Sequence, residues 1–180
     1  MNEITLIATV AFGLEIVVKN ELIALGFENI KVSEGKVEFE ATLGDIPRAN
    51  LWLRSADRVL LKMGEFEAFT FDELFEKTKA LPWENLITKD GKFDVNGKAV
   101  KSTLGSVRAC QSIVKKAVVE RLKEKYLKEW FEETGPEFNI QISMLKDVAV
   151  LTIDTSGVGL HKRGYREAGG EAPLKETLAA

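Results

Sequence analysis

The sequence is poor in the residue types that most often build reactive or cross-linked sites. Its 180 residues include one cysteine, Cys110, and one histidine, His161. A single cysteine excludes an intramolecular disulfide, and the two residues cannot supply a zinc site rich in cysteine and histidine. No group of metal-ligating residues surrounds His161, and no pair of carboxylates has a spacing that indicates acid/base catalysis. We therefore expect neither a metal ion nor catalytic residues in this chain.

Long apolar runs are also missing. No hydrophobic stretch approaches the roughly 18 residues that a membrane-spanning helix needs. The first ten residues lack the basic start of a secretory signal and are instead typical of a β-strand. The composition, 45% hydrophobic and 29% charged, is that of a chain able to bury a proper core. These observations predict a cytoplasmic protein with no membrane partner.

The chain lacks an overall positive charge, since its net charge is −3. Taken alone, this value argues against a nucleic-acid-binding protein. A phosphate backbone, however, responds to the charge within a Debye length of about 8 to 10 Å rather than to the whole-chain sum. Between residues 101 and 128 only Glu120 and Glu124 are acidic, whereas eight residues are basic: Lys101, Arg108, Lys115, Lys116, Arg121, Lys123, Lys125 and Lys128. This stretch is the candidate anion-binding region.

The first 65 residues predict a ferredoxin-like β-α-β-β-α-β unit. An apolar, β-branched run is typical of a buried first strand, and apolar residues at helical spacing follow it until Gly26. Two short alternating segments around Glu34-Gly35 indicate a β-hairpin. The predicted elements are, in order, strand 4–10, helix 14–25, strands 30–33 and 36–41, helix 46–53 and strand 58–64.

A second α+β module is predicted to begin near residue 66. Thr70 stands three residues before Glu73, the spacing of a capping box, so a helix should start there and run to about Ala80. A strand at 92–100 and a long helix at about 105–130 follow. The module ends in a hairpin of strands 138–145 and 148–154 that turns at Lys146-Asp147. The fold class expected for the whole chain is α+β.

The first candidate site lies at the start of the long helix. Small hydroxyl residues, Ser102, Thr103 and Ser106, surround the helix start, where free backbone N–H groups and the helix dipole favour an anion. Further along, Arg108, Ser112 and Lys115 fall on one face of the helix, opposite its apolar positions. This pattern predicts a phosphate-binding surface. It equally fits a helix cap followed by solvated lysines, and charge pattern alone leaves both interpretations open.

The second candidate site is the basic segment 161–166. Lys162 can neutralise a phosphate, Arg163 and Arg166 can each fork onto one, and Tyr165 can stack on an exposed base. The alternative is a structural linker whose arginines pair with acidic groups of a neighbouring domain. Both interpretations stay open.

Two short motifs near the C-terminus carry a resemblance to a known family. The run Leu160-His-Lys-Arg-Gly-Tyr-Arg166, followed by Ala172-Pro-Leu-Lys-Glu-Thr-Leu178, resembles a junction in bacterial large-subunit ribosomal RNA guanine methyltransferases. In that family the junction joins an RNA-binding THUMP half to a catalytic half. The resemblance implies a ferredoxin-like subdomain at 1–65, a THUMP domain at 66–160, and a linker at 161–180 that leads into a methyltransferase domain.

The same resemblance implies a function. In the family, a methyl group passes from S-adenosylmethionine to the exocyclic amine of a guanine, and structured RNA, here 23S ribosomal RNA, is the partner. This sequence departs from the family by having neither a Gly-rich cofactor loop nor an Asn-Pro-Pro-Tyr type motif. We therefore expect an RNA-binding, specificity-determining region that has no cofactor of its own. The resemblance also favours the Lys- and Ser-rich helix start as the place where RNA is contacted.

Two other hypotheses remain. The chain could be a stand-alone THUMP adaptor, or the RNA-binding half of another RNA-modifying enzyme, such as one that thiolates transfer RNA. It could also be a metabolite-sensing or scaffold domain, because ferredoxin-like units host many functions. The codons after Ala180 would separate the first of these from the methyltransferase hypothesis, and indifference to RNA would favour the last.

Overall fold

The computed structural model describes residues 3–164 and 174–180 and confirms the mixed α+β fold. By their contacts, Met1–Leu61 with Asp154–Ala180 form a first unit, and Lys62–Ile153 form a second. Hydrogen-bonded strands follow the order β2-β3-β1-β4-β7-β6-β5. The long strand β4 (Ala56–Glu67) contributes its first half to the first unit and its second half to the other. The limits predicted for functional domains, 1–65, 66–160 and 161–180, stay predictions.

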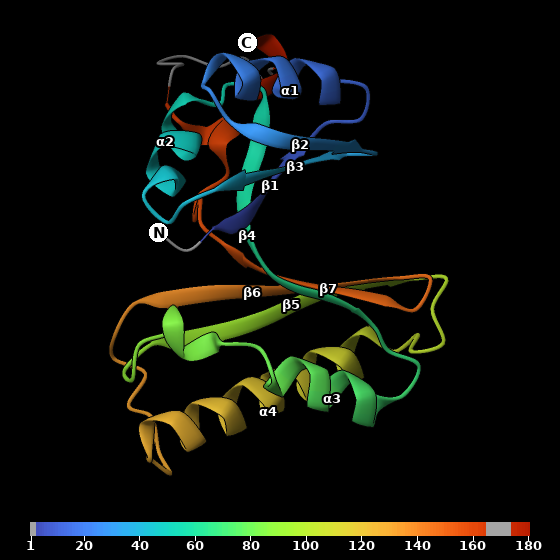
Figure 1. The fold of residues 1–180 in the computed structure, drawn as a ribbon, viewed down its shortest axis with the longest axis vertical. Coiled ribbons are helices and arrows are strands. Elements are labelled where there is room, and N and C mark those ends of the chain that lie inside the picture. Colours follow the sequence, from blue (N-terminus) through green and yellow to red (C-terminus); the bar gives the residue numbers. More distant parts are fainter. Residues whose placement is uncertain (1–2, 165–173) are drawn as a thin grey trace. The chain divides into compact units, whose positions relative to one another are not determined.

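The first unit has the predicted β-α-β-β-α-β order (Figure 1). Its central strand β1 pairs antiparallel with β3 and buries three consecutive residues, Leu6, Ile7 and Ala8, which explains its continuous apolar sequence. The first helix packs Val18 and Leu22 against this sheet. Before β4 the elements are β1 (Ile4–Val10), α1 (Glu15–Ala24), β2 (Glu28–Ser33), β3 (Lys36–Ala41) and α2 (Asp45–Trp52).

The second unit is a sheet with both of its α-helices on one side (Figure 1). The two helices contact each other, and the longer one also contacts the edge strand β5, which runs parallel to β6. One half of the predicted capping box is present, because the Thr70 hydroxyl accepts the Glu73 N–H, while the Glu73 carboxylate accepts the N–H of Phe69 rather than that of Thr70. After β4 the elements are α3 (Phe71–Lys79), the 3₁₀ turn η1 (Trp83–Asn85), β5 (Lys92–Val100), α4 (Val107–Tyr126), β6 (Glu137–Leu145) and β7 (Val148–Asp154).

Helix α4 organises the core of the second unit. Its inward positions, Cys110, Val114, Ala117, Val118 and Leu122, are all buried, and burial raises the pKa of the Cys110 thiol. The predicted extension of this helix to about residue 130 was wrong. The helix ends at Tyr126, whose hydroxyl donates to the carbonyl oxygen of Ile87 at 2.7 Å, and Leu127 then adopts a left-handed conformation.

The chain returns to the first unit after β7. A short 3₁₀ turn, η2 (Leu160–Lys162), and a four-residue helix, α5 (Glu176–Ala179), contact each other. Pro173, a residue type that suits the first turn of a helix, lies outside the described residues. Within them, the helix begins at Glu176.

Candidate nucleic-acid interface

The loop between β5 and α4 is held in place by hydrogen bonds from its own polar residues. The Ser102 hydroxyl donates to the Val100 carbonyl at 3.1 Å, and the Ser106 hydroxyl caps α4 by accepting the Ala109 N–H at 3.3 Å. The Thr103 N–H donates to the Asp147 carboxylate at 2.6 Å. Ser102 and Ser106 therefore shape the loop, whereas the side chains of Lys101 and Thr103 are exposed to solvent.

The polar face of α4 runs along the edge strand β5. Arg108 and Ser112 are exposed on it. Lys115 lies further along, with its ammonium nitrogen 3.7 Å from the Asp94 carboxylate and 5.9 Å from the centre of the Phe93 ring. The three predicted residues thus share one face, but they are not equivalent. Arg108 has no ion pair among the described residues, while Lys115 has an exposed and therefore weak one.

Much of the positive charge in the second half of α4 is neutralised locally. The Arg121 guanidinium holds the Glu84 carboxylate with two hydrogen bonds, of 3.0 and 2.7 Å. This contact is the main reason that the pKa of Glu84 is lowered and the pKa of Arg121 is raised. Lys125 lies near Glu84, and Lys123 near two other glutamates. On α4 itself, the cations without an ion pair among the described residues are Arg108 near the start and Lys116 in the middle.

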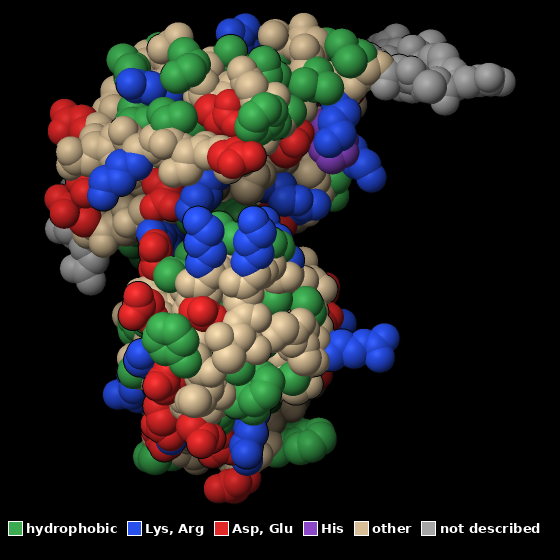
Figure 2. All heavy atoms as spheres, turned by 90° about the vertical axis from the view of Figure 1, so that its right-hand side faces the viewer, with side chains coloured by type: hydrophobic (Ala, Val, Ile, Leu, Met, Phe, Trp, Pro, Cys, Tyr) green, Lys and Arg blue, Asp and Glu red, His purple; other side chains and the backbone are tan. Residues whose placement is uncertain are grey.

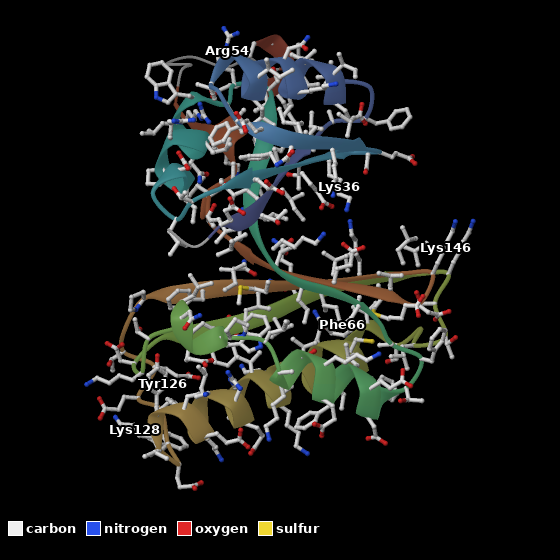
Figure 3. The ribbon with its side chains drawn as sticks, viewed as in Figure 1. Lys36, Arg54, Phe66, Tyr126, Lys128 and Lys146 are labelled. Atoms are coloured by element: carbon white, nitrogen blue, oxygen red, sulfur yellow. The ribbon has the colours of Figure 1, made fainter. Side chains whose placement is uncertain are left out.

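Lys146 and Asp147 belong to the same surface, although the sequence predicted only a turn there. The Lys146 N–H donates to the Val100 carbonyl at 3.3 Å, so Lys146 adjoins Lys101. Figure 3 labels Lys146 at the end of the second unit, and Figure 2 shows basic side chains gathered there. The charge of Lys146 was visible in the sequence. Its proximity to Lys101 was not, because it depends on contacts between segments about 45 residues apart.

The second predicted site belongs to the first unit and is only partly described. Arg163 donates from its guanidinium to the carbonyl oxygens of Asn50, Leu51 and Leu53, at 2.6, 3.1 and 2.6 Å, and so caps the C-terminal end of α2. Lys162 is exposed. Tyr165 and Arg166 lie outside the described residues. This segment and the start of α4 thus belong to different units, and the contacts of the segment with RNA stay a prediction.

The second half of the junction motif also contacts the first unit. The Thr177 hydroxyl donates to one oxygen of the Asp57 carboxylate at 2.8 Å, and the Lys175 ammonium lies 3.8 Å from the other. Thr177 is buried, whereas Leu174 and Leu178 beside it are exposed. These contacts tie the second half of the junction motif to strand β4.

The turn between β1 and α1 is closed by the Glu15 carboxylate, which accepts the Gly13 N–H at 2.9 Å. The other oxygen of that carboxylate accepts the Gly35 N–H, the largest of the effects that lower the Glu15 pKa. The Glu15 carboxylate thus ties this turn to the turn between β2 and β3.

Two kinds of site are absent from the described part of the chain. Its His, Cys, Asp and Glu residues form no group of three that could hold a metal ion. The His161 Nδ1 atom is buried there without a hydrogen-bond partner. No helix in the described ranges has both the length and the apolar character required to cross a membrane.

Comparison with known families gives one match for each unit. Residues 5–60 match the family model of the RlmL ferredoxin-like domain, and residues 68–154 match that of the THUMP domain. The two modules and their order agree with the resemblance recognised in the sequence.

Whole-chain relatives carry methyltransferase names. The chain is 58% identical over its full length to YpsC of Bacillus subtilis (strain 168), whose name places it among RNA methyltransferases, and it covers 47% of that protein. It is 36% identical over 96% of its length to the ribosomal RNA large subunit methyltransferase K/L of Syntrophotalea carbinolica, of which it covers 24%. The chain thus spans less than half of each of these relatives.

Solved structures of similar proteins have the same fold. One from Listeria monocytogenes str. 4b F2365, named as a predicted N6-adenine-specific DNA methylase, superimposes with a TM-score of 0.95 at 58% identity. Another, SMU.472, is named as a methyltransferase and was solved with SAH; its TM-score is 0.91 at 44% identity. The chain is covered to 99% in both cases, but it spans only 47% and 48% of those chains.

Proposed function

Because the chain belongs to the proteins that join an RlmL ferredoxin-like domain to a THUMP domain, we propose that it is the RNA-binding region of an RNA methyltransferase. The proposed target is a guanine of 23S ribosomal RNA, in the cytoplasm. The methyl donor would be S-adenosylmethionine, bound by a part of the relatives that this chain does not match. In this division, residues 66–160 bind RNA, residues 1–65 position them, and residues 161–180 connect them to the catalytic part.

The observation that carries the proposal is the unneutralised positive charge at the start of α4. Lys101 and Arg108 are exposed and have no ion pair among the described residues, whereas the second half of the helix is paired with glutamates. Lys116, in the middle of the helix, is also exposed and has no ion pair among those residues. Together these cations produce a local positive potential that a phosphate backbone can meet.

The residues would divide their roles by position. Lys101, Arg108 and Lys115 would neutralise phosphates, and the exposed pair of Lys115 with Asp94 costs little to exchange for a phosphate. Thr103 and Ser112 would donate hydroxyl hydrogen bonds to the backbone, while Ser102 and Ser106 hold the loop and cap the helix. Lys162, Tyr165 and Arg166 would form a second contact, and Arg163 would hold this segment against the end of α2.

Such a surface would select its target by shape. The base edges of double-stranded RNA lie in a deep, narrow groove, so basic side chains sense mainly the positions of phosphates and 2′-hydroxyls. A base that is to be methylated usually has to leave its stack. The RNA-binding region would therefore set which nucleotide reaches the catalytic part, without taking part in the chemistry.

The proposal is tested by binding to hairpin fragments of 23S ribosomal RNA over a salt titration. Replacing Lys101, Arg108 and Lys115 by Ala should flatten the slope of log K against log salt by about two, since each phosphate contact contributes about 0.7 for single-stranded segments. The matched control replaces Lys89, Lys92 and Lys128, three exposed lysines at the other end of β5 and α4.

The control variant should keep the slope of the unmodified chain. Equal losses in both variants would reduce the effect to net charge and contradict the assigned surface. If the unmodified chain fails to bind RNA, or if a DNA hairpin of the same sequence competes equally well, RNA recognition itself is contradicted.

A further inference from the structure

The turn between β6 and β7 is built from residues that are unusual for its geometry. Lys146 and Asp147 form a two-residue connection in which both have a positive φ, of 50° and 64°. Turns of this kind favour Asn-Gly, because a side chain at positive φ crowds the backbone. Lys101, which begins the neighbouring loop, also has a positive φ, of 49°. Two lysines therefore occupy backbone conformations that lysine adopts rarely.

Asp147 fixes both lysines. Its carboxylate accepts the Thr103 N–H, and its own N–H donates to the Ser102 hydroxyl at 3.1 Å. Its carbonyl oxygen accepts the Ala68 N–H at 2.8 Å. One residue thus joins the turn, the loop before α4 and the chain just before α3. The acidic group is directed at the loop backbone.

The result is a pair of neighbouring cations at one end of the second unit. The Lys146 N–H bonds to the residue that precedes Lys101, and both side chains are exposed and lack an ion pair among the described residues. The hydrogen bonds identify one carboxylate next to these lysines, that of Asp147. It accepts a hydrogen bond from the Thr103 N–H. Glycine or asparagine would adopt these backbone conformations with less strain. Lysines that are kept together at such strained positions indicate a function rather than a folding requirement.

We propose that the Lys146 turn and Lys101 form one phosphate clamp for the RNA backbone, with Asp147 as its positioning residue. This inference rests on the proposed RNA binding and deepens it. The clamp adds Lys146 to the proposed RNA interface. Its two lysines lie on two loops at the same end of the sheet, the β6–β7 turn and the loop before α4. Its ligand is the sugar–phosphate backbone rather than a base, because the clamp offers ammonium groups and no aromatic platform.

The test replaces each lysine by Asn, which tolerates a positive φ. Lys146→Asn and Lys101→Asn should each weaken binding to a 23S ribosomal RNA hairpin about four- to fivefold at 0.15 M salt, and flatten the salt slope by about 0.7 to 0.9. The melting temperature should stay the same or rise, because strain is relieved. Lys128→Asn, at the opposite end of the unit (Figure 3), should change neither affinity nor slope.

The outcomes separate this inference from the proposed function. If Lys146→Asn behaves like Lys128→Asn while Arg108→Ala still weakens binding, the clamp is refuted and RNA binding through α4 stands. If the unmodified chain does not bind RNA, both are refuted. A fall in melting temperature with unchanged affinity would make the turn a purely structural feature.

Substitutions of Asp147 provide a second test, for which the clamp and a simple charge effect predict opposite changes in RNA affinity. Removing a negative charge near phosphates should strengthen binding if Asp147 acts only through its charge. In the clamp, Asp147→Ala should weaken binding several-fold, because the Thr103 N–H loses its acceptor and the loop that carries Lys101 is released. Asp147→Asn keeps an oxygen acceptor and should bind at least as tightly as the unmodified chain. Tighter binding by both variants would contradict the positioning role.

Discussion

Replacing Arg163 tests whether this residue of the basic junction has a structural role or contacts RNA. Its guanidinium donates to three backbone carbonyls at the C-terminal end of α2, at 2.6 to 3.1 Å. Replacing Arg163 by Ala removes these donors and leaves the carbonyl oxygens at the helix end without them. Because the side chain is only half-buried, water would satisfy part of the loss. The variant should therefore be destabilised without being unfolded.

The expected cost follows from the kind of bond. A hydrogen bond to a charged group contributes about 1.5 to 3 kcal/mol, and a cation at a helix C-terminus adds about 0.3 to 1 kcal/mol. These contributions overlap on one side chain and are screened by solvent. We expect Arg163→Ala to lower the free energy of unfolding by about 2 to 3 kcal/mol. Arg163→Lys should lie between, because an ammonium cannot fork onto three carbonyls.

Urea unfolding followed by circular dichroism measures this change. With a slope of about 2 kcal/mol per molar urea, the midpoint should fall by about 1 M. Lys162→Ala removes the same charge from the adjacent, exposed residue and should leave the midpoint unchanged. The reasoning is refuted if Arg163→Ala keeps the midpoint and loses RNA affinity, since the guanidinium would then bind RNA instead of the helix end.

Two further predictions concern the second unit. Leu122→Ala should destabilise the protein by about 3 kcal/mol through a cavity, because Leu122 is 1% exposed; Leu127→Ala, at 90% exposure, should have no measurable effect, and equal urea midpoints would contradict this. Arg121 lowers the pKa of Glu84 in the folded protein. The contribution of this carboxylate to stability is therefore complete above its unfolded pKa of about 4.5, and it is lost as the pH falls through the lower folded value. The difference in stability between the protein and Glu84→Gln should therefore be constant from pH 7 to 5 and should shrink as the pH falls below 4.5; a difference that does not shrink in acid would argue against the pair.

Much of the fold was predictable because it depends on local patterns. The alternating segments around Gly35 and the apolar run of β1 gave the strands of the first unit, and Lys92–Val100 was predicted with its observed bounds. The end of α4 was not, because neither Gly nor Pro marks it. The helix stops where Tyr126 meets Ile87, and sequence patterns do not show such long-range contacts.

The candidate site shows the same limit. Charge and helix-start residues identified Lys101 and Arg108, since both features are local in sequence. The roles of Asp147 and Arg163 were hidden, because their partners lie 44 and about 110 residues away. In both cases a polar residue that looked like a surface or ligand group binds backbone instead. The sequence could not decide the role of either residue, because each role depends on contacts between distant segments that the fold brings together.

The central claim is that this chain recognises RNA through phosphates at one end of its second unit. The most direct test is the affinity of the unmodified chain for 23S ribosomal RNA hairpins as a function of salt concentration. The four contacts of this unit, from Lys101, Arg108, Lys115 and Lys146, predict a linear plot of log K against log salt with a slope of about −3, which becomes steeper where Lys162 and Arg166 also contact phosphates. Binding that is absent, or that does not depend on salt, would contradict the account.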